Sequence, residues 1–315
     1  MAETTGVVVT GASGFIGRHV MAAIKTTWPD RPILALGGPD SRTMTPIDLT
    51  VPDQLRAALD GFAFDTVIHL AAQSSVTDAA ASPGDVWRSN VVGTINLAEA
   101  VNALSPGAQV IHAGSAEAYG ESFLSGQPLD EDAPLRPANA YARTKVAAEL
   151  ALIDILAPTA SVVLLRLFNH TGPGQDERFV APSFAAQIAR IEATGLAGAI
   201  RVGDLTARRD FGNVADAAAA FVAVMNAAPR LERVSRFNVC SGVTRPVSDL
   251  LDVLLALSNH PITVETDPAR MRPSSIGMAA GSNAALTAAT GWAPRVSFDQ
   301  TMTELMTYWR GHAGR

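Results

Sequence analysis

The sequence predicts an α/β fold: a doubly wound parallel sheet followed by a smaller, mixed α/β domain. In the first half, short aliphatic runs alternate with longer helical patterns, as in repeated βαβ units. A glycine-rich turn joins the first such run to the first helical pattern. After Phe168 a Gly/Pro-rich stretch and several later prolines shorten the expected elements. The later third of the chain is therefore expected to supply the second domain.

The expected strands are β-branched or aliphatic runs that are too short for helices and are bounded by Gly, Pro or Asp. They are Gly6–Thr10, Pro32–Leu36, Thr66–Leu70, Gln109–Ala113, Ser161–Phe168 and, later, Phe237–Cys240. Helical patterns fill the intervals, and prolines at positions 52 and 83 mark helix starts. The expected helices are Ile16–Thr26, Pro52–Leu59, Val86–Ala103, Ala140–Leu156, Pro182–Ala193 and Val214–Asn226.

These elements predict two domains, each built from two separate stretches of the chain. Residues 1–168 plus about 212–240 are expected to form the sheet domain, because strand and helix patterns of the first half return there. Residues from about 169 to 211, together with 241–315, are expected to form the smaller domain.

Composition excludes several classes of protein. The 315 residues include 30 Asp and Glu against 24 Lys and Arg, whereas nucleic-acid binding needs clustered cations. With 48% hydrophobic and 17% charged residues, the chain can bury a large core. It has no apolar run long enough for a membrane span and no basic leader, and its lone Cys240 excludes an internal disulfide. We expect a cytoplasmic protein without nucleic-acid or membrane partners.

The glycine-rich turn places Gly11, Gly14 and Gly17 directly after the first strand and at the start of a helix. Gly11 permits a tight turn, Gly14 lets backbone amides approach a pyrophosphate, and Gly17 allows close packing of helix on strand. The helix N-terminus adds free N–H groups and a favourable dipole for the anion. The spacing is G-x-x-G-x-x-G, and in this strand–turn–helix context it predicts a dinucleotide-binding Rossmann fold.

The choice of nicotinamide cofactor depends on the end of the second strand. A carboxylate there would bind the ribose 2′-hydroxyl of NAD, but this chain reads Leu36-Gly37-Gly38. Arg18 and Arg42 are candidates to meet a 2′-phosphate, so the sequence favours NADP(H), with NAD as the alternative. Asp48 lies where a loop can reach the adenine amino group, although an isolated Asp is more often a turn residue.

Tyr141 and Lys145 lie four residues apart on a predicted helix, so both side chains share one face. The chain has three tyrosines and two lysines, and chance would give about 0.02 such pairs. A tyrosine pKa of ~10 is too high for proton exchange at neutral pH. A nearby ammonium and a nicotinamide cation favour the phenolate, because one charge at ~4 Å supplies about 4 kcal/mol at a dielectric of ~20. The pair is then able to exchange a proton with a sugar oxygen.

Ser115 follows the strand at Gln109–Ala113, at the end where open α/β sheets place their sites. With the Tyr/Lys pair downstream, we interpret it as a hydrogen-bond partner of the reacting oxygen. His69 and His112 end predicted strands and are expected to be buried and hydrogen-bonded. The six histidines show no metal-ligand spacing, so no metal site is expected.

Over its whole length the chain resembles the extended short-chain dehydrogenase/reductases, a group of nucleotide-sugar epimerases, dehydratases and reductases. The resemblance is carried by the glycine turn at 10–17, His69-Leu-Ala-Ala72, Asn90 in Ser-Asn-Val-Val-Gly-Thr, Ser115 and Tyr141-x-x-x-Lys145. Within the group the chain is most similar to reductases of GDP-4-keto-6-deoxy-D-mannose, on stretches 166–175, 202–211, 237–242, 271–274, 281–283 and 290–294.

The resemblance implies hydride transfer from NADPH to the C4 ketone of a GDP-linked 4-keto-6-deoxyhexose. Tyr141 would protonate the alkoxide, Ser115 would share that oxygen, and Lys145 would hold the nicotinamide ribose. The implied cofactor-binding residues are Gly11, Ser13, Gly14, Phe15, Ile16, Gly17, Arg42, Asp48, Leu49, Leu70, Ala71, Ala72, Asn90, Tyr141 and Lys145. The implied substrate-binding residues are Ser75, Glu117, Asn169, Val180, Arg209 and Arg272.

Two positions bear on the reaction and the nucleotide. Dehydratases of the group typically present Thr/Ser-Asp-Glu, in which the Asp is the acid for loss of the C6 hydroxyl, but this chain has Ala116 before Glu117. Simple reduction to a rhamnose-type or talose-type GDP-6-deoxyhexose is therefore favoured. Relatives commonly read Arg-Pro-Ser/Thr-Glu where this chain has Ser275, which leaves GDP, UDP and dTDP open as the nucleotide.

Two alternative functions and one quaternary arrangement remain open at this point. An NAD-dependent nucleotide-sugar 4-epimerase would use the same fold, and a non-catalytic NADP(H)-sensing protein would need only the binding site. The helical stretches Val86–Ala103 and Ala140–Leu156 are apolar enough to form a four-helix bundle across a homodimer, an arrangement common in the family. Packing within one chain explains them equally well.

Overall fold

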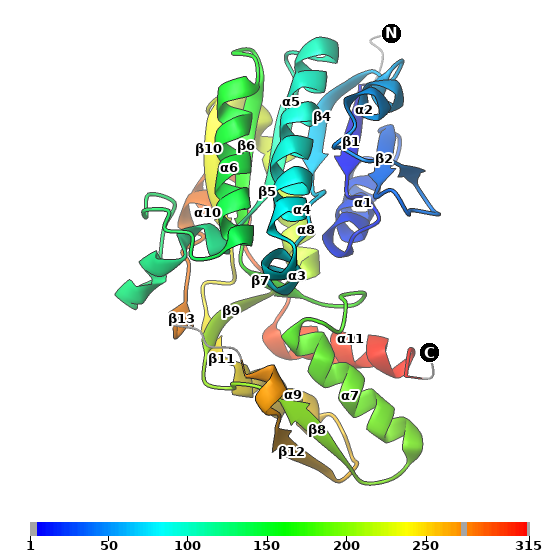
Figure 1. Ribbon diagram of the computed structural model, residues 1–315, viewed down its shortest axis with the longest axis vertical. Coiled ribbons are helices and arrows are strands. Elements are labelled where there is room, and N and C mark those ends of the chain that lie inside the picture. The colour runs from blue at the N-terminus through cyan, green and yellow to red at the C-terminus, as the bar shows by residue number, and fades with distance from the viewer. Residues whose placement is uncertain (1–4, 272–275, 314–315) are drawn as a thin grey trace.

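The computed structural model describes residues 5–271 and 276–313 and places a seven-stranded sheet over a smaller lobe (Figure 1). All neighbouring strands are parallel, in the order β10-β6-β5-β4-β1-β2-β3. The strands are β1 Gly6–Thr10, β2 Ile33–Gly37, β3 Thr45–Pro46, β4 Phe64–His69, β5 Gln109–Ser115, β6 Ser161–Leu167 and β10 Val234–Val239. The predicted doubly wound α/β fold is confirmed.

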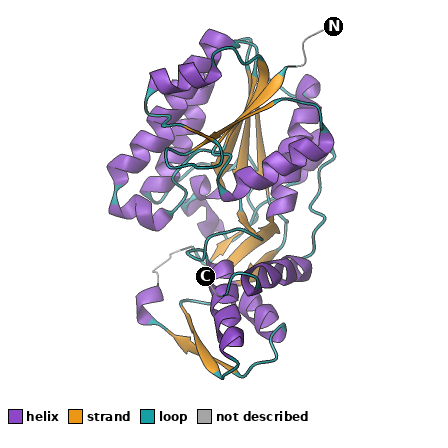
Figure 2. Ribbon diagram, turned by 90° about the vertical axis from the view of Figure 1, so that its right-hand side faces the viewer, coloured by secondary structure: helices purple, strands orange, loops and turns teal. Residues whose placement is uncertain are grey.

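Helices cover both faces of the sheet, which lies between them in Figure 2. They are α1 Phe15–Thr27, α2 Pro52–Leu59, α3 Val76–Ala81, α4 Pro83–Trp87, α5 Gly93–Leu104, α6 Ala140–Ile155, α8 Val214–Ala227 and α10 Ala284–Thr290. Side chains along β1 alternate between the two cores: Val7 and Val9 pack in the core of α1 and α8, and Val8 packs in the core of α2, α5 and α6. Apolar residues on both faces are what a buried parallel strand requires.

The helix predicted over Val86–Ala103 is interrupted. A π-helical turn, Arg88–Val92, separates α4 from α5, and its end is marked by the Gly93 N–H bonding to the carbonyl of Arg88, five residues back. A π-turn inserts one extra residue into a helix and changes which side chains face inward. Here it turns Asn90 into the protein interior. Residues 86–103 are helical as predicted, but helical periodicity alone does not reveal such an insertion, so the π-turn was not predicted.

The smaller lobe lies beneath the carboxyl ends of the sheet strands (Figure 1). Its strands are β7 Asn169–Thr171, β8 Gly198–Val202, β9 Arg208–Asn213, β11 Thr244–Pro246, β12 Ile262–Thr266 and β13 Met278–Ala279. Its helices are α7 Val180–Thr194, α9 Val247–Ala256 and α11 Phe298–Arg310, which pack around a core of their own. Arg272 and Ser275 lie outside the described residues.

One segment of the later third packs with the sheet. Leu286 of α10 and Trp292 belong to the core of α1 and α8, although the sequence assigns 241–315 to the smaller domain. The domain boundaries themselves stay a prediction. Among the described residues, the structure contains no helix that combines the length and apolarity needed to cross a membrane.

Candidate active site

The glycine-rich turn links β1 to α1 at the carboxyl edge of the sheet. Gly11 has φ +68°, and a Cβ there would lie 2.6 Å from the amide nitrogen of Ala71. A Cβ on Gly17 would lie 2.3 Å from the carbonyl oxygen of Gly11. A Cβ on Gly14 would meet only that same oxygen, at 3.1 Å, so the space on the other side of Gly14 is open at the helix N-terminus. The turn therefore fits the pyrophosphate of a dinucleotide, with N–H groups of Phe15 and Ile16 at the start of the helix.

The end of β2 lies beside the glycine-rich turn. A Cβ on Gly37 would meet Ser41 at 2.4 Å and the Ser13 hydroxyl at 3.3 Å, so the segment after β2 folds back over this position. Arg42 is exposed. Arg18 instead donates hydrogen bonds to the carbonyls of Ser13 (2.7 Å) and Gly174 (3.1 Å) and thereby ties the glycine-rich turn to the smaller lobe.

The remaining adenosine-side candidates lie in loops after β3 and β4. Asp48 accepts hydrogen bonds from the amide (2.9 Å) and hydroxyl (2.7 Å) of Thr50, as in an Asx turn. Leu49 is buried against Gly93. Leu70, Ala71 and Ala72 follow β4 directly, and the amides of the first two bond to Thr10.

Ser115 and Tyr141 meet where β5 ends and α6 begins. Ser115 is the last residue of β5, and its hydroxyl accepts the amide of Glu117 at 3.2 Å. Tyr141 is 8% exposed. Burial raises the pKa of its phenol to about 12, a hydrogen bond from the side chain of Ser115 partly offsets this, and the charge of Glu117 adds to it. In the free protein the phenol is therefore protonated at neutral pH.

Lys145 lies one turn further along α6 and is buried. Its ammonium donates to the carbonyl of Ala113 at 2.8 Å. Burial lowers the pKa of Lys145 to about 8, against the opposing charge of Glu149. The ammonium is thus a cation close to releasing its proton, which is typical of functional lysines.

The smaller lobe reaches the site through Arg209 of β9. Glu117 and Arg209 attract each other: burial lowers the pKa of Arg209, and Glu117 partly restores it. Glu117 also accepts a hydrogen bond from Asn139 at 3.1 Å. The charge of Glu117 thus acts both on an arginine of the smaller lobe and on the tyrosine of α6.

The other substrate candidates lie before or at the start of three elements, α3, β7 and α7. Ser75 precedes α3 and accepts the amide of Ala79 at its carbonyl. Asn169 is exposed at the start of β7, which pairs with β9. Val180 is 38% exposed at the first position of α7. The structure thus groups Ser115, Glu117, Tyr141, Lys145 and Arg209, while Arg272 falls outside the described residues.

The two strand-end histidines differ. His69 is hydrogen-bonded through both ring nitrogens, to Thr10 (2.8 Å) and Thr94 (2.9 Å). His112 is equally buried, but among the described residues neither of its ring nitrogens has a partner. The prediction of a hydrogen-bonded core histidine therefore holds for His69 and was wrong for His112. Burial lowers both pKa values, so both rings are neutral.

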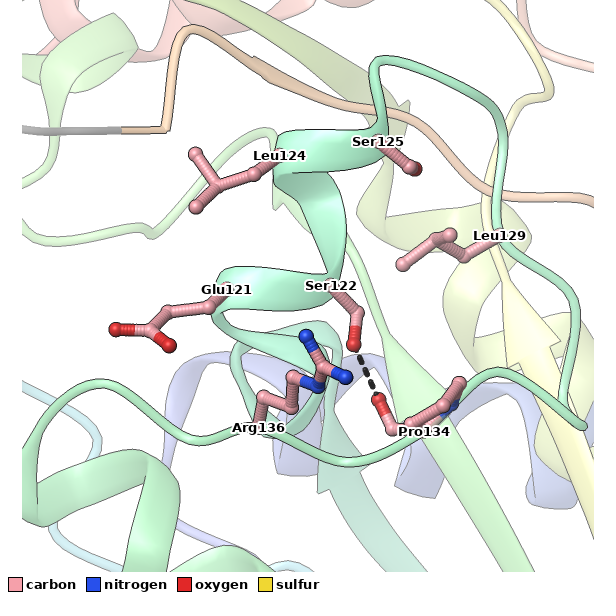
Figure 3. Close-up of a pocket in the computed structure, with 7 residues that line it drawn as sticks. All are labelled: Glu121, Ser122, Leu124, Ser125, Leu129, Pro134 and Arg136. Atoms are coloured by element: carbon pink, nitrogen blue, oxygen red, sulfur yellow. Dashed lines mark hydrogen bonds between the residues drawn. The ribbon is translucent and has the colours of Figure 1, made fainter.

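A surface hollow lies away from these residues. Its volume is about 430 Å³, and it is formed by the segment between β5 and α6 (Figure 3). Within it the hydroxyl of Ser122 donates to the carbonyl of Pro134 at 2.6 Å. The lining residues are Glu121, Ser122, Leu124, Ser125, Leu129, Pro134 and Arg136. The hollow contains none of the predicted catalytic side chains.

Sequence reasoning missed Asn139. Its side chain caps α6 by accepting the amide of Ala142 at 2.8 Å, and it also donates to Glu117. Asn directly before a helical pattern is a known N-cap signal, so this residue was available to sequence analysis. Among the described residues no group of three His, Cys, Asp or Glu side chains is placed to hold a metal ion.

Comparison with known proteins places the chain in a family. The model of the NAD dependent epimerase/dehydratase family matches residues 7–240. The chain belongs to this family. A GDP-6-deoxy-D-mannose reductase from Pseudomonas aeruginosa is 33% identical over 97% of both chains. A UDP-glucose 4-epimerase from Corynebacterium glutamicum is 27% identical over 94% of this chain and 93% of its own.

A solved structure supports the same placement. RMD from Pseudomonas aeruginosa complexed with NADPH superposes with a TM-score of 0.85 at 31% identity, over 98% of this chain and 100% of its own. The expected membership and the nicotinamide dinucleotide as cofactor class are thereby confirmed. The family and the GDP-sugar reductase relative make the chain an oxidoreductase that acts on nucleotide sugars.

Proposed function

We propose that the chain is an NADPH-dependent nucleotide-sugar 4-ketoreductase that converts a GDP-4-keto-6-deoxyhexose to a GDP-6-deoxyhexose. The observation that carries the proposal is a protonated, buried Tyr141 beside Ser115, with methyl-bearing Ala116 where a dehydratase would have its acid. The similarity to a GDP-6-deoxy-D-mannose reductase supports the choice of GDP.

The proposed chemistry divides between cofactor and chain. The glycine-rich turn between β1 and α1 would hold NADPH, which would supply a hydride for C4 of the ketone. Tyr141 holds the proton that the C4 oxygen takes up, because burial raises its pKa to about 12 and so keeps the phenol protonated in the free protein. The Ser115 hydroxyl donates to the same oxygen, and the Lys145 ammonium stabilises the phenolate that is left behind. The ketone thus gains one hydride and one proton and becomes a hydroxyl.

Arg209 and Glu117 are proposed to position the substrate. The guanidinium of Arg209 matches the geometry of phosphate oxygens, and it reaches the catalytic edge from the smaller lobe. Once Arg209 binds phosphate, the Glu117 carboxylate can accept a hydrogen bond from a hydroxyl of the sugar. Asn169, Ser75 and Val180 are proposed as further substrate contacts, and Arg272 as a second phosphate partner, from the sequence pattern alone.

The cofactor preference is proposed from the end of β2. Gly37 and Gly38 provide no carboxylate for a ribose 2′-hydroxyl, and Arg42 is exposed and available for a 2′-phosphate. The similarity to RMD complexed with NADPH supports this choice. NADPH is therefore expected to bind more tightly than NADH, and fluorescence titration with the two cofactors measures the difference.

One assay tests the function. The protein is incubated with NADPH and GDP-4-keto-6-deoxymannose, and the product is identified by NMR. We expect one NADPH oxidised per GDP-6-deoxyhexose formed, and the C4 configuration then distinguishes the rhamnose-type from the talose-type product. Turnover only with a UDP- or dTDP-linked ketosugar would reject GDP. Interconversion of UDP-glucose and UDP-galactose without net NADPH oxidation would show a 4-epimerase. Binding of NADPH without any turnover would show a non-catalytic NADP(H) sensor.

We also propose that two copies pair through α5 and α6, which lie side by side on one face of the molecule (Figure 1). Large apolar side chains remain exposed on these two helices and on the π-turn before α5, among them Val92 at 43%, Leu104 at 44% and Leu150 at 55%. Leu150→Arg is expected to convert a dimer to a monomer in sedimentation experiments. A monomeric wild-type protein would reject the bundle.

A further inference from the structure

A buried hydrogen-bond path connects the π-turn to the catalytic helix. Asn90, at the centre of the π-turn, is 2% exposed. Its Oδ1 accepts the amide of Gln73 at 2.8 Å, and its Nδ2 donates to the carbonyl of Gln73 at 3.2 Å and to Thr144 Oγ1 at 3.1 Å. Thr144 is fully buried, and its hydroxyl lies 2.7 Å from the carbonyl oxygen of Tyr141.

The direction of these bonds follows from the groups themselves. A peptide N–H can only donate, so the side-chain atom of Asn90 that meets the Gln73 amide is the oxygen. The other atom is therefore the NH2 group, and Thr144 must accept from it. The single proton of the Thr144 hydroxyl is then free for the Tyr141 carbonyl. Both amide hydrogens of Asn90 are used within the protein, so its side chain acts on the helix rather than donating to a ligand.

A second branch links Asn90 to the glycine-rich turn. The hydroxyl of Thr94 donates to the Asn90 carbonyl at 2.6 Å, so it accepts from Nε2 of His69 at 2.9 Å. The Nδ1 of His69 then accepts from the hydroxyl of Thr10 at 2.8 Å, directly before Gly11. This order requires a neutral His69, and burial, aided by Lys145, lowers the pKa of its ring to about 3. The path fixes one tautomer and connects the cofactor turn with the tyrosine helix.

We propose that Thr144 is a positioning residue for the reaction. Its hydroxyl, held by Asn90 of the π-turn, fixes the first turn of α6 and so the direction in which Tyr141 presents its phenol beside Ser115. The first turn of a helix lacks part of its backbone hydrogen bonding and opens most easily, so an added bond there restricts its movement. Small displacements of a reacting group reduce rate strongly. The inference rests on the proposed function, in which Tyr141 supplies the proton.

The chain contains a matched control. Thr301 of α11 is also buried, its hydroxyl donates to the carbonyl of Ser297 at 2.8 Å, and it accepts from Nδ2 of Asn213 at 3.1 Å. Thr144→Val and Thr301→Val thus remove the same pair of bonds, one beside Tyr141 and one within the smaller lobe. Thr144→Ser restores the hydroxyl. Thr144→Ser and Thr144→Ala differ only in the hydroxyl group, so comparing them measures the effect of that group. This comparison replaces Thr144→Val if that variant does not fold.

The experiment combines steady-state kinetics, NADPH affinity by fluorescence, melting temperature and amide hydrogen exchange of residues 72–76 and 140–146 without substrate. For Thr144→Val we expect kcat to fall about ten-fold or more, with NADPH affinity within about three-fold of wild type. Exchange should become faster in both segments, and Thr144→Ser should recover most of kcat. Thr301→Val should lower the melting temperature similarly and leave kcat and these segments unchanged.

The opposite pattern would overturn the proposal. If Thr144→Val loses melting temperature as Thr301→Val does but keeps its kcat, Thr144 is a structural residue only. The same conclusion follows if Thr144→Ser and Thr144→Ala have equal kcat values. If the wild-type enzyme does not reduce the ketosugar, the proposed function fails, and the exchange data alone decide whether Thr144 holds the first turn of α6.

Discussion

Two buried cations lie behind the catalytic edge, and their partners differ. Arg166 of β6 is 2% exposed and binds Glu149 of α6 through two hydrogen bonds, of 2.9 and 3.2 Å. Lys145, 4% exposed and one turn before Glu149 on the same helix, has a carbonyl oxygen as its hydrogen-bond acceptor. Burial opposes both charges, but Glu149 more than offsets it for Arg166 and raises that pKa, while the pKa of Lys145 falls to about 8.

The difference separates a structural charge from a functional one. A buried guanidinium paired with a carboxylate stays charged and holds β6 against α6. A buried ammonium whose hydrogen-bond acceptor is a carbonyl has a lowered pKa. A phenolate or anionic ligand that forms beside it therefore stabilises its charged form. The comparison predicts that a change at Tyr141 acts on catalysis, that a change at Glu149 acts mainly on stability, and that the stability contribution of Lys145 depends on pH.

The largest expected effect is on catalysis. Tyr141→Phe removes the proton donor and keeps the ring, so kcat should fall by about 10²–10⁴. NADPH should still bind with near wild-type affinity, because the glycine-rich turn is untouched. Steady-state kinetics with the ketosugar and fluorescence titration with NADPH measure the two quantities. A variant of near-normal rate would remove Tyr141 from its proposed role.

Breaking the structural pair should reduce stability. Glu149→Gln leaves the buried Arg166 guanidinium without its hydrogen-bonded countercharge, which should cost about 3–5 kcal/mol of the free energy of unfolding. Urea denaturation measures it. The control is Glu177→Gln, which removes the half-exposed partner of Arg190 and should change the free energy by less than about 1 kcal/mol. Equal losses in the two variants would contradict the distinction between buried and exposed pairs.

The lowered pKa of Lys145 predicts a pH-dependent stability. Between the folded-state pKa of about 8 and the ordinary value of 10.5, the unfolded chain keeps a proton that the folded chain releases. Wild-type stability should therefore rise with pH across this window. Lys145→Met should lack that rise and be more stable than wild type at pH 7, by up to about 3 kcal/mol. Parallel curves for the two proteins from pH 7 to 10 would show that the Lys145 pKa is not lowered.

The smallest expected effect concerns the helix cap. Asn139→Ala removes the side chain that accepts the Ala142 amide, which should cost about 1 kcal/mol. It also releases Glu117. Asn139→Asp keeps the cap but repels Glu117, so it should preserve stability and weaken substrate binding. Urea denaturation and KM measurements separate the two roles, and wild-type KM values in both variants would assign Asn139 to the cap alone.

Much of the local architecture could be predicted because it depends on short-range pattern. β1 and α2 occupy the predicted residues, since an aliphatic run before a glycine turn and a proline at a helix start are local signals. The alternation of Val7, Val8 and Val9 between two cores likewise follows from strand geometry. The glycines of the turn and the i,i+4 spacing of Tyr141 and Lys145 are patterns of the same kind.

What only the tertiary structure decided involves residues that meet across long stretches of chain. The π-turn at Asn90 makes sense only against Gln73 and Thr144, so helical periodicity cannot reveal it. The absence of a partner for His112 within the described chain, and the raised pKa of Tyr141, depend on burial that no local pattern measures. The sequence thus determined which groups are available for chemistry. The packing of α6 on the sheet determined their protonation, because desolvation depends on the surroundings of a side chain and not on its neighbours in sequence.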